Sequence, residues 1–153
     1  MEEPYADCPA TRGDLMIDPD EIYRRMVFAH HRGWQIAIHV IGDAANRLCV
    51  ELYARLLREY PRSDHRHRLE HASVLDARTI DEIARLGLVV SAQPLFLHSK
   101  KDWLPRRLGT ERVARAYPFR SLLPGGGPSS GWNGLRRGGL TLGGACWGLV
   151  FRM

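Results

Sequence analysis

The sequence predicts an α/β fold in which parallel strands alternate with helices. Three short segments of strand length lie between residues 35 and 92, and the first and third are apolar and contain β-branched residues. Segments of helical length, each with apolar residues along one side, separate them. Strands joined through single helices pair in parallel, with right-handed crossovers. Three strands are too few to close a barrel, so the pattern predicts part of a TIM-like (β/α)8 barrel.

Local signals predict four helices. The first follows Asp18 as its N-cap, has Pro19 in its first turn and ends at Gly33. Pro61 ends the second helix and Gly87 the third, because proline cannot continue a helix and glycine readily adopts the left-handed conformation that closes one. The second, third and fourth helices are predicted at Ala44–Glu59, Asp76–Leu86 and Thr110–Tyr117.

The three strands are predicted at Gln35–Ile41, His67–His71 and Leu88–Ala92. The first reads QIAIHVI and the third is LVVSA followed by Gln93-Pro94, both typical of buried strands. A polar loop that contains His98 and extends to Trp103 follows the third strand. This loop is interpreted either as an exposed connection or as a lid over a site at the strand ends.

The composition changes abruptly at Pro124. Ten of the 15 glycines lie in residues 124–153, and the last acidic residue is Glu111. The sequence therefore predicts two parts: residues 1–123 as a partial barrel, and residues 124–153 as an irregular Gly-rich tail. The tail also carries apolar residues that a solvated linker would lack, namely Trp132, Trp147, Leu149 and Phe151. One hypothesis is that a frameshift replaced the original C-terminal sequence.

Composition points to a soluble globular protein. The 153 residues are 44% hydrophobic and 25% charged, and no apolar run is long enough to span a membrane. Three separated cysteines form no CxxC pair, and no secretory signal is visible, so we expect a cytoplasmic protein. The net charge of +5 rests on arginines scattered among acids, so no nucleic-acid partner is expected.

Two histidines lie at the carboxyl ends of neighbouring predicted strands. His39 and His71 are 71 − 39 = 32 residues apart, about one β-α-β repeat. Corresponding ends of parallel strands lie side by side, so both imidazoles can point into one site. Neutral imidazoles are ligands for zinc and similar divalent ions. From the spacing alone, a buried histidine with a structural role remains the alternative.

Other polar residues near the strand ends are candidates for supporting roles. Asp43 either caps the second helix or stands beside the site, facing the ligands or the substrate. Gln93 and His98 follow the third strand, where a barrel presents groups that contact substrate. Glu70 is expected to form an ion pair with a neighbouring arginine.

The remaining histidines are given no chemistry. His30 and His31 end the first helix, where a basic group favours the helix dipole. His65 and His67 form an HxH pattern, which on a strand can bind a metal ion because alternate residues share a face. Here it lies in the charged segment DHRHR, which favours a solvated surface.

Four segments together resemble the metal-dependent amidohydrolase superfamily. They are GWQIAIHVIGDAAN, HRLEHAS, GLVVSAQPLFLHSKKDWLPRRLG and ERVARAYPFRSLL, in this order within residues 13–123. Within the superfamily, the chain looks like the amidohydrolase-3 branch, which includes the N-substituted formamide deformylases.

The resemblance implies strands five to seven of a distorted (β/α)8 barrel. It also implies hydrolysis of carbon–nitrogen bonds in small amide- or formamide-type substrates, with one or two divalent metal ions, usually zinc. The histidine ligands of the fifth and sixth family strands fall on His39 and His71. In such enzymes a metal-bound hydroxide attacks the amide carbonyl.

Several family features have no counterpart in the sequence: the first-strand HxH, the fourth-strand bridging ligand and the eighth-strand aspartate. No aspartate follows Asp102. We therefore expect the chain alone to be inactive and, because of its open sheet edges, to aggregate or fold poorly. The alternative is a non-catalytic protein that binds a partner through the apolar tail or completes a barrel with a second polypeptide. The oligomeric state stays open.

Overall fold

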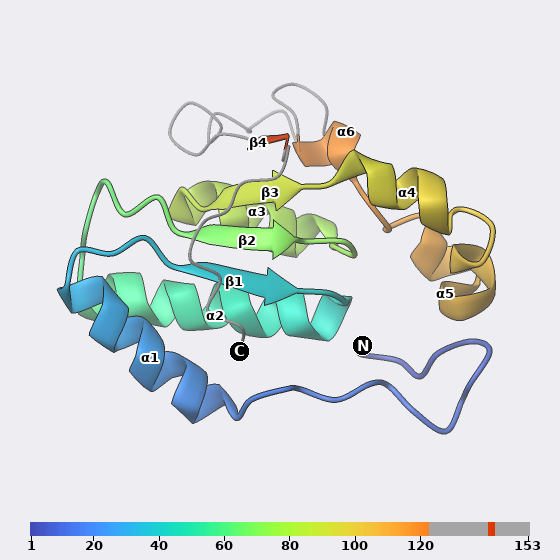
Figure 1. The fold of residues 1–153 in the computed structure, drawn as a ribbon, viewed down its shortest axis with the longest axis horizontal. Helices are drawn as coiled ribbons and strands as arrows, with labels where there is room; N and C mark the ends of the chain where they lie inside the picture. Colours follow the sequence, from blue (N-terminus) through green and yellow to red (C-terminus); the bar gives the residue numbers. More distant parts are fainter. Residues whose placement is uncertain (123–140, 143–153) are drawn as a thin grey trace.

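The computed structural model of the chain describes residues 1–122 and 141–142 (Figure 1). One parallel sheet contains, in spatial order, β1 (Ala37–Val40), β2 (Arg68–His71), β3 (Val89–Ala92) and the two-residue β4 (Thr141–Leu142). Helix α2 (Asp43–Glu59) connects β1 to β2, and α3 (Ala77–Leu86) connects β2 to β3. The predicted α/β class, an open sheet with three parallel strands alternating with helices, is confirmed.

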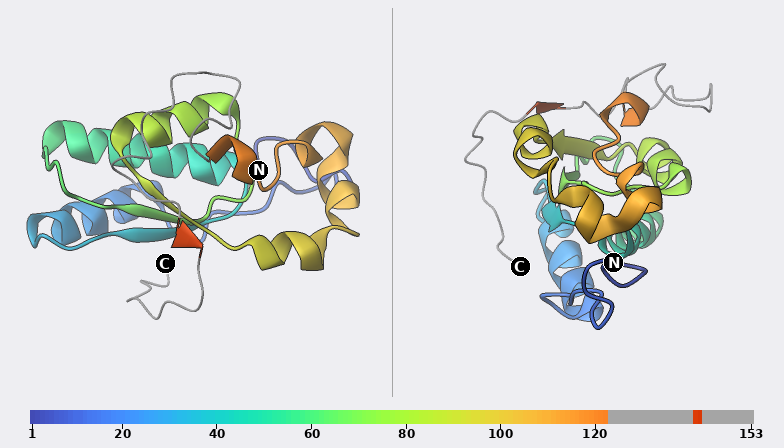
Figure 2. Two further views of the ribbon diagram at one scale, coloured as in Figure 1. Left: turned by 90° about the horizontal axis from the view of Figure 1, so that it is seen from above. Right: turned by 90° about the vertical axis from the view of Figure 1, so that its right-hand side faces the viewer.

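The helices that join the strands form one layer on the sheet. Figure 2 shows α2 and α3 on the same face of the sheet, and α1 (Pro19–His31) packs against α2. Side chains from all these elements fill the core between the layers. Met26, Tyr53, Leu56, Leu69 and Ile83 are among its most completely buried members.

The predicted helix ends are largely confirmed. Asp18 caps α1 by accepting a hydrogen bond from the backbone N of Asp20 at 2.9 Å. Asp76 caps α3 through the backbone N of Thr79 at 2.7 Å. Gly87 closes α3 with a φ of 67°, a left-handed conformation that glycine adopts without steric cost.

The segment after β3 differs from the prediction. Residues Pro94–Lys100 form helix α4 where a polar loop was expected, because Pro94 begins this helix as well as ending the strand. Helix α5 spans Leu104–Val113 and is kinked at Gly109, so the predicted helix Thr110–Tyr117 begins and ends too late. A short helix, α6 (Phe119–Leu122), completes the described part of residues 1–122.

The prediction of a solvated surface for the HxH pattern is wrong. His65 and His67 are only 6% and 0% exposed, and His30 from α1 is 6% exposed beside them. The Nδ1 of His30 lies 2.9 Å from the Nε2 of His67, and the ring centroids of His65 and His67 are 4.8 Å apart. These three residues, the histidine triad, form a buried network at the amino-terminal ends of the strands.

Hydrogen bonds fix the protonation of each triad ring. The Nε2 of His30 faces the carbonyl oxygen of Tyr60 at 2.9 Å, so it carries a proton and Nδ1 accepts from His67. The Nδ1 of His67 accepts from the backbone N of Ile36 at 3.1 Å. His65 donates from Nε2 to the carbonyl of Leu86 at 2.9 Å and accepts at Nδ1 from the backbone N of His67 at 3.0 Å. All three rings are therefore neutral, with the proton on Nε2.

Burial favours the same neutral forms. It is the main cause that lowers the pKa of His30 and of His65, and it lowers the pKa of His67 to about 3. The neighbouring Arg62, which donates to the carbonyl oxygen of His30 at 2.9 Å, depresses these pKa values further.

Of the predicted Gly-rich tail, only Thr141 and Leu142 are described. They pair in parallel with Ser91 and Ala92 of β3. The apolar residues on which the partner-binding alternative rests, Trp132, Trp147, Leu149 and Phe151, lie outside the described residues. The predicted boundary at Pro124 and the frameshift hypothesis stay predictions.

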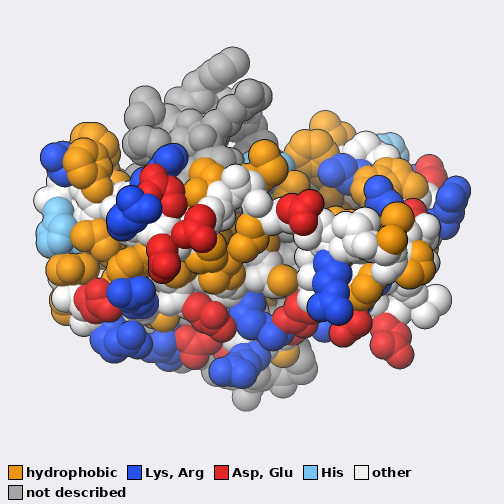
Figure 3. Space-filling view, turned by 90° about the horizontal axis from the view of Figure 1, so that it is seen from below, with side chains coloured by type: hydrophobic (Ala, Val, Ile, Leu, Met, Phe, Trp, Pro, Cys, Tyr) orange, Lys and Arg blue, Asp and Glu red, His pale blue; other side chains and the backbone are white. Residues whose placement is uncertain are grey.

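Charges of both signs alternate on the described surface. Figure 3 shows Lys and Arg side chains interspersed with Asp and Glu on the face seen from below. Glu21 pairs with Arg24 at 2.6 Å and with Arg25 at 2.7 Å along α1, and Arg55 pairs with Glu59 at 2.9 Å along α2. These pairs balance charges of opposite sign locally along the two helices. No helix in the described part is long and apolar enough to cross a membrane.

The histidine triad predicts acid sensitivity. The pKa of His67 is lower in the folded chain than in the unfolded chain, so its contribution to stability is complete above about pH 6.5 and is lost as the pH falls towards about 3. We expect the free energy of unfolding, measured in urea between about pH 7.5 and 5 where carboxylates stay ionised, to fall by up to about 1.4 kcal/mol per pH unit for each neutral histidine.

The matched variant is His67→Gln, whose amide can still donate towards His30 but does not titrate. We expect a flatter pH dependence than in the native chain. The same slope in both proteins would show that protonation of His67 does not control acid stability.

Candidate metal centre

The structure brings the two predicted ligand residues together. His39 and His71 lie at the carboxyl ends of β1 and β2, with their ring centroids 4.1 Å apart and an interplanar angle of 70°. His39 is exposed and His71 is half-buried. The arrangement follows from the parallel pairing of β1 with β2, which places the two strand ends side by side.

Regular strand alternation alone would not bring these rings together. The register pairs His39 with Glu70 and Val40 with His71, and paired residues in a parallel sheet share a face. His71 has a φ of +72°, and the backbone N of Ala72 donates to the carbonyl of Glu70 at 3.1 Å. This hydrogen bond closes a γ-turn around His71, a conformation that is rare and strained for a residue with a Cβ. The turn reverses the strand end and lets the His71 ring meet His39.

The preceding residue in β2 has a structural partner. Glu70 forms an ion pair with Arg68 at 2.6 Å, and both side chains are largely buried. The predicted ion pair of Glu70 with a neighbouring arginine is confirmed. The charge of the Glu70 carboxylate is therefore balanced by Arg68 of the same strand.

This pair differs from the histidine triad in the hydrogen bonding of its ring nitrogens. All six nitrogens of the triad rings are hydrogen-bonded. Among the described residues, no ring nitrogen of His39 or His71 has a hydrogen-bond partner. Burial, with the charges of His39 and Lys100, lowers the pKa of His71 to about 4, so this ring is neutral at pH 7 and keeps a lone pair.

Asp43 lies just after β1 but does not cap α2 as one interpretation expected. Gly42, with a φ of +101°, occupies the N-cap and Asp43 is the first helical residue. The Asp43 side chain is 4% exposed, and its Oδ1 accepts from the backbone N of Ala44 and of Glu2, both at 2.9 Å. Its Oδ2 is buried and has no hydrogen-bond partner among the described residues.

The two predicted substrate contacts sit differently. Gln93 lies between β3 and α4, and its Oε1 is buried without a hydrogen-bond partner in the described part of the chain. His98 lies on α4 and is exposed. The described contacts place His98 against neither His39 nor His71.

Two neighbours of the pair were missed in the sequence. The ring of Phe96 on α4 lies 5.5 Å from the ring of His71, and the Nζ of Lys100 lies 4.8 Å from the centre of the Phe96 ring. Phe96 and Lys100 are four residues apart, the spacing that places side chains together on a helix. That signal is visible only once residues 94–100 are recognised as a helix.

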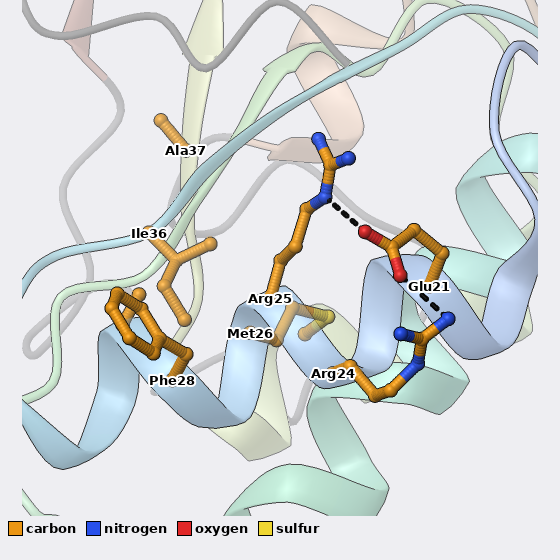
Figure 4. A pocket seen from close by; sticks show the side chains of 8 residues that line it. Glu21, Arg24, Arg25, Met26, Phe28, Ile36 and Ala37 are labelled. Carbon is orange, nitrogen blue, oxygen red and sulfur yellow. Dashed lines mark hydrogen bonds and ion pairs between the residues drawn. The ribbon is translucent and has the colours of Figure 1, made fainter.

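Two hollows border β1. The larger, about 390 Å³, is lined by Met26, Phe28, Ile36 and Ala37, with the ion-paired Glu21 at its rim (Figure 4). The smaller, about 300 Å³, is lined by His39 and mostly apolar residues, including Ile17 and Leu48. Of these two hollows, the smaller one is lined by a member of the histidine pair, His39.

The described residues do not contain a complete metal site. No group of three or more His, Cys, Asp or Glu side chains within residues 1–122 is arranged to hold a metal ion. The donor set at the strand ends consists of two imidazoles. Two imidazoles are half of the four ligands that zinc usually takes.

A family model described as "Amidohydrolase family" matches residues 1–131. The chain belongs to the amidohydrolase family. The match extends beyond the predicted boundary at Leu123, and its last residues, 123–131, lie outside the described part of the chain.

Named relatives and solved structures agree with this membership. The amidohydrolase chain is 34% identical over 127 residues to "Putative amidohydrolase YtcJ" of Bacillus subtilis, covering 82% of this chain. It is 36% identical over 124 residues, 80% of this chain, to the protein LONG AFTER FAR-RED 3 of Arabidopsis thaliana. Crystal structures described as uncharacterized metal-dependent hydrolases match 78% of the chain: that from Pyrococcus horikoshii with a TM-score of 0.69 and 32% identity, that from Pyrococcus furiosus with 0.68 and 35%.

The amidohydrolase chain spans less than a quarter of the length of these relatives. It covers 23% of the Bacillus protein, 21% of the Arabidopsis protein, and 23% and 24% of the two archaeal chains. With the structural match, the sheet and its helices are part of an amidohydrolase fold.

The γ-turn predicts an unusual order of stability at position 71. Glycine normally destabilises a strand relative to alanine, but it adopts positive φ without steric cost. We expect His71→Gly to be more stable than His71→Ala by about 1 kcal/mol in urea unfolding. Position 39, which has no positive φ, is the control: His39→Gly should be less stable than His39→Ala. The same order at both positions would argue against the strained turn.

Proposed function

We propose that the chain contributes to the metal centre of a hydrolase that cleaves carbon–nitrogen bonds of amide or formamide type. One observation carries the proposal: two imidazoles from neighbouring parallel strands lie 4.1 Å apart at the strand ends, with none of their ring nitrogens hydrogen-bonded among the described residues. A histidine with a structural role normally satisfies its buried nitrogens, as the triad does. Membership of the amidohydrolase family supports the same role.

The donor chemistry of the pair fits a divalent ion, and we propose zinc. Neutral imidazole suits zinc and other borderline metals. His71 is held in the neutral form by burial, and the γ-turn fixes its ring beside His39. A bound ion would acidify a water molecule and polarise the substrate carbonyl. Further ligands have to come from outside the described residues or from solvent.

The other polar residues take supporting roles in this proposal. Asp43 holds the start of α2 through its contacts with Ala44 and Glu2, and so positions the segment directly after β1. The Oε1 of Gln93 is an acceptor without a partner among the described residues, suited to an N–H of an amide substrate. His98, exposed on α4, is a candidate for contacts with more distant parts of the substrate.

We also propose a cytoplasmic location. Cys8 and Cys49 are free thiols in the structure, as expected in a reducing compartment.

Zinc binding to the metal-free 153-residue chain tests the proposal. Isothermal titration with ZnCl₂ should show a site that His39→Ala and His71→Ala each weaken by about tenfold or more, because each removes one of two ligands. His31→Ala removes an exposed histidine at the end of α1 and is the control. Zinc affinity that is unchanged by either ligand variant, or lowered as much by His31→Ala, would contradict the proposal.

A further inference from the structure

The surface beside the histidine pair combines apolar groups with a cation. Helix α4 contributes no buried residue to the core, and Leu95, Phe96 and Leu97 are 77%, 38% and 38% exposed. Trp103, just after the helix, is 45% exposed. Exposed apolar groups gathered next to a candidate site mark a surface that binds something.

The groups form a continuous row that starts at the proposed ligands. The His71 ring contacts His39 at 4.1 Å on one side and Phe96 at 5.5 Å on the other. The Nζ of Lys100 then lies over the Phe96 ring at 4.8 Å and over the Trp103 ring at 5.9 Å. Cation–π contacts with two rings hold the ammonium group near the pair.

The Lys100 charge lacks an anionic partner in the described part of the chain. Each ion pair there joins an arginine to a carboxylate: Arg24 and Arg25 with Glu21, and others of the same kind. Lys100 is half-buried, and its positive charge reaches His71. A partly desolvated cation without a counter-ion favours an anion at this place.

We propose that Lys100, held over Phe96 and Trp103, selects substrates that carry a carboxylate next to an apolar group. The apolar group packs on the exposed side of Phe96, and the carboxylate accepts hydrogen bonds from the Lys100 ammonium. Because Phe96 contacts His71 and Lys100 contacts Phe96, one small substrate can reach the Phe96 ring, the Lys100 ammonium group and the histidine pair. As a statement about substrate choice the inference rests on the proposed hydrolase function, but the binding it predicts does not need the metal.

The two lysines of the chain allow a direct test. Lys100 and Lys101 are the only lysines, so biosynthetic labelling with ¹³Cε-lysine gives two side-chain signals, which Lys101→Arg assigns. The metal-free chain is titrated with 3-phenylpropionate and with the neutral 3-phenylpropionamide, which has nearly the same shape. We expect the carboxylate to shift the Lys100 signal but not the Lys101 signal, and to bind about fivefold more tightly than the amide.

Variants separate a local site from a general effect of charge. Lys100→Gln should abolish the preference for the carboxylate, and Lys100→Arg should keep it. Lys101→Gln removes the same charge one residue further along the chain and should leave the preference intact. Equal affinity for both compounds in the native chain, or an equal loss in the two Gln variants, would overturn the inference. If the chain does not bind zinc, the metal proposal fails, but the preference for the carboxylate can still be measured because that titration contains no metal.

Discussion

The parallel pairing of β1 with β2 is the constraint on which the candidate site depends. It sets the ends of the two strands side by side and fixes which residues share a face, and in that register His39 is opposite Glu70. The γ-turn at His71 then breaks the regular alternation of side chains, so that the His71 ring lies beside the His39 ring. Pairing without the turn would leave the second imidazole on the face of Val40, and the turn without the pairing would leave it without a neighbour.

The opposite end of the sheet holds that register in place. The Tyr53 hydroxyl donates to the carbonyl of Arg68 at 3.0 Å and lies 3.3 Å from that of Ile36, so α2 is tied to the starts of both strands. His67 accepts from the backbone N of Ile36, and its own carbonyl accepts from the backbone N of Val89 at 2.8 Å. The hydrogen bonds of Tyr53 and His67 thus hold the amino ends of the strands together. At the carboxyl ends, the ring nitrogens of His39 and His71 have no hydrogen-bond partner among the described residues, and parallel barrels place their functional groups at that end.

Sequence alone was sufficient where the signal is local. The cap at Asp18, the stop at Gly87 and the three strands each depend on residues a few positions apart, and all are confirmed. The burial of His65 and His67 could not be seen, because DHRHR reads as a charged surface. The burial depends on His30, which lies 37 residues from His67 in sequence.

Backbone geometry was equally hidden. The sequence shows a histidine at position 71 but not its positive φ, which a Gly or Asn would have signalled. The sequence indicates Pro94 as the end of a strand, but proline also begins helices, and here it begins α4. Without that helix, the sequence gives no reason to place Phe96 and Lys100 beside His71. At His71 and at Pro94 the residue type is compatible with two backbone conformations, and tertiary contacts decide which one forms.

The histidines at the two ends of the sheet differ in how their ring nitrogens are hydrogen-bonded. At the amino ends, four ring nitrogens bond to backbone groups and the other two to each other, so the triad has no lone pair left for a metal ion. At the carboxyl ends, the strand backbone is paired within the sheet and the turn, and α4 brings only a ring and a cation to His71. The ring nitrogens of His39 and His71 therefore have no hydrogen-bond partner among the described residues. The proposed metal role of this pair rests on the two observations together: the rings lie side by side at the strand ends, and their nitrogens have no partner among the described residues.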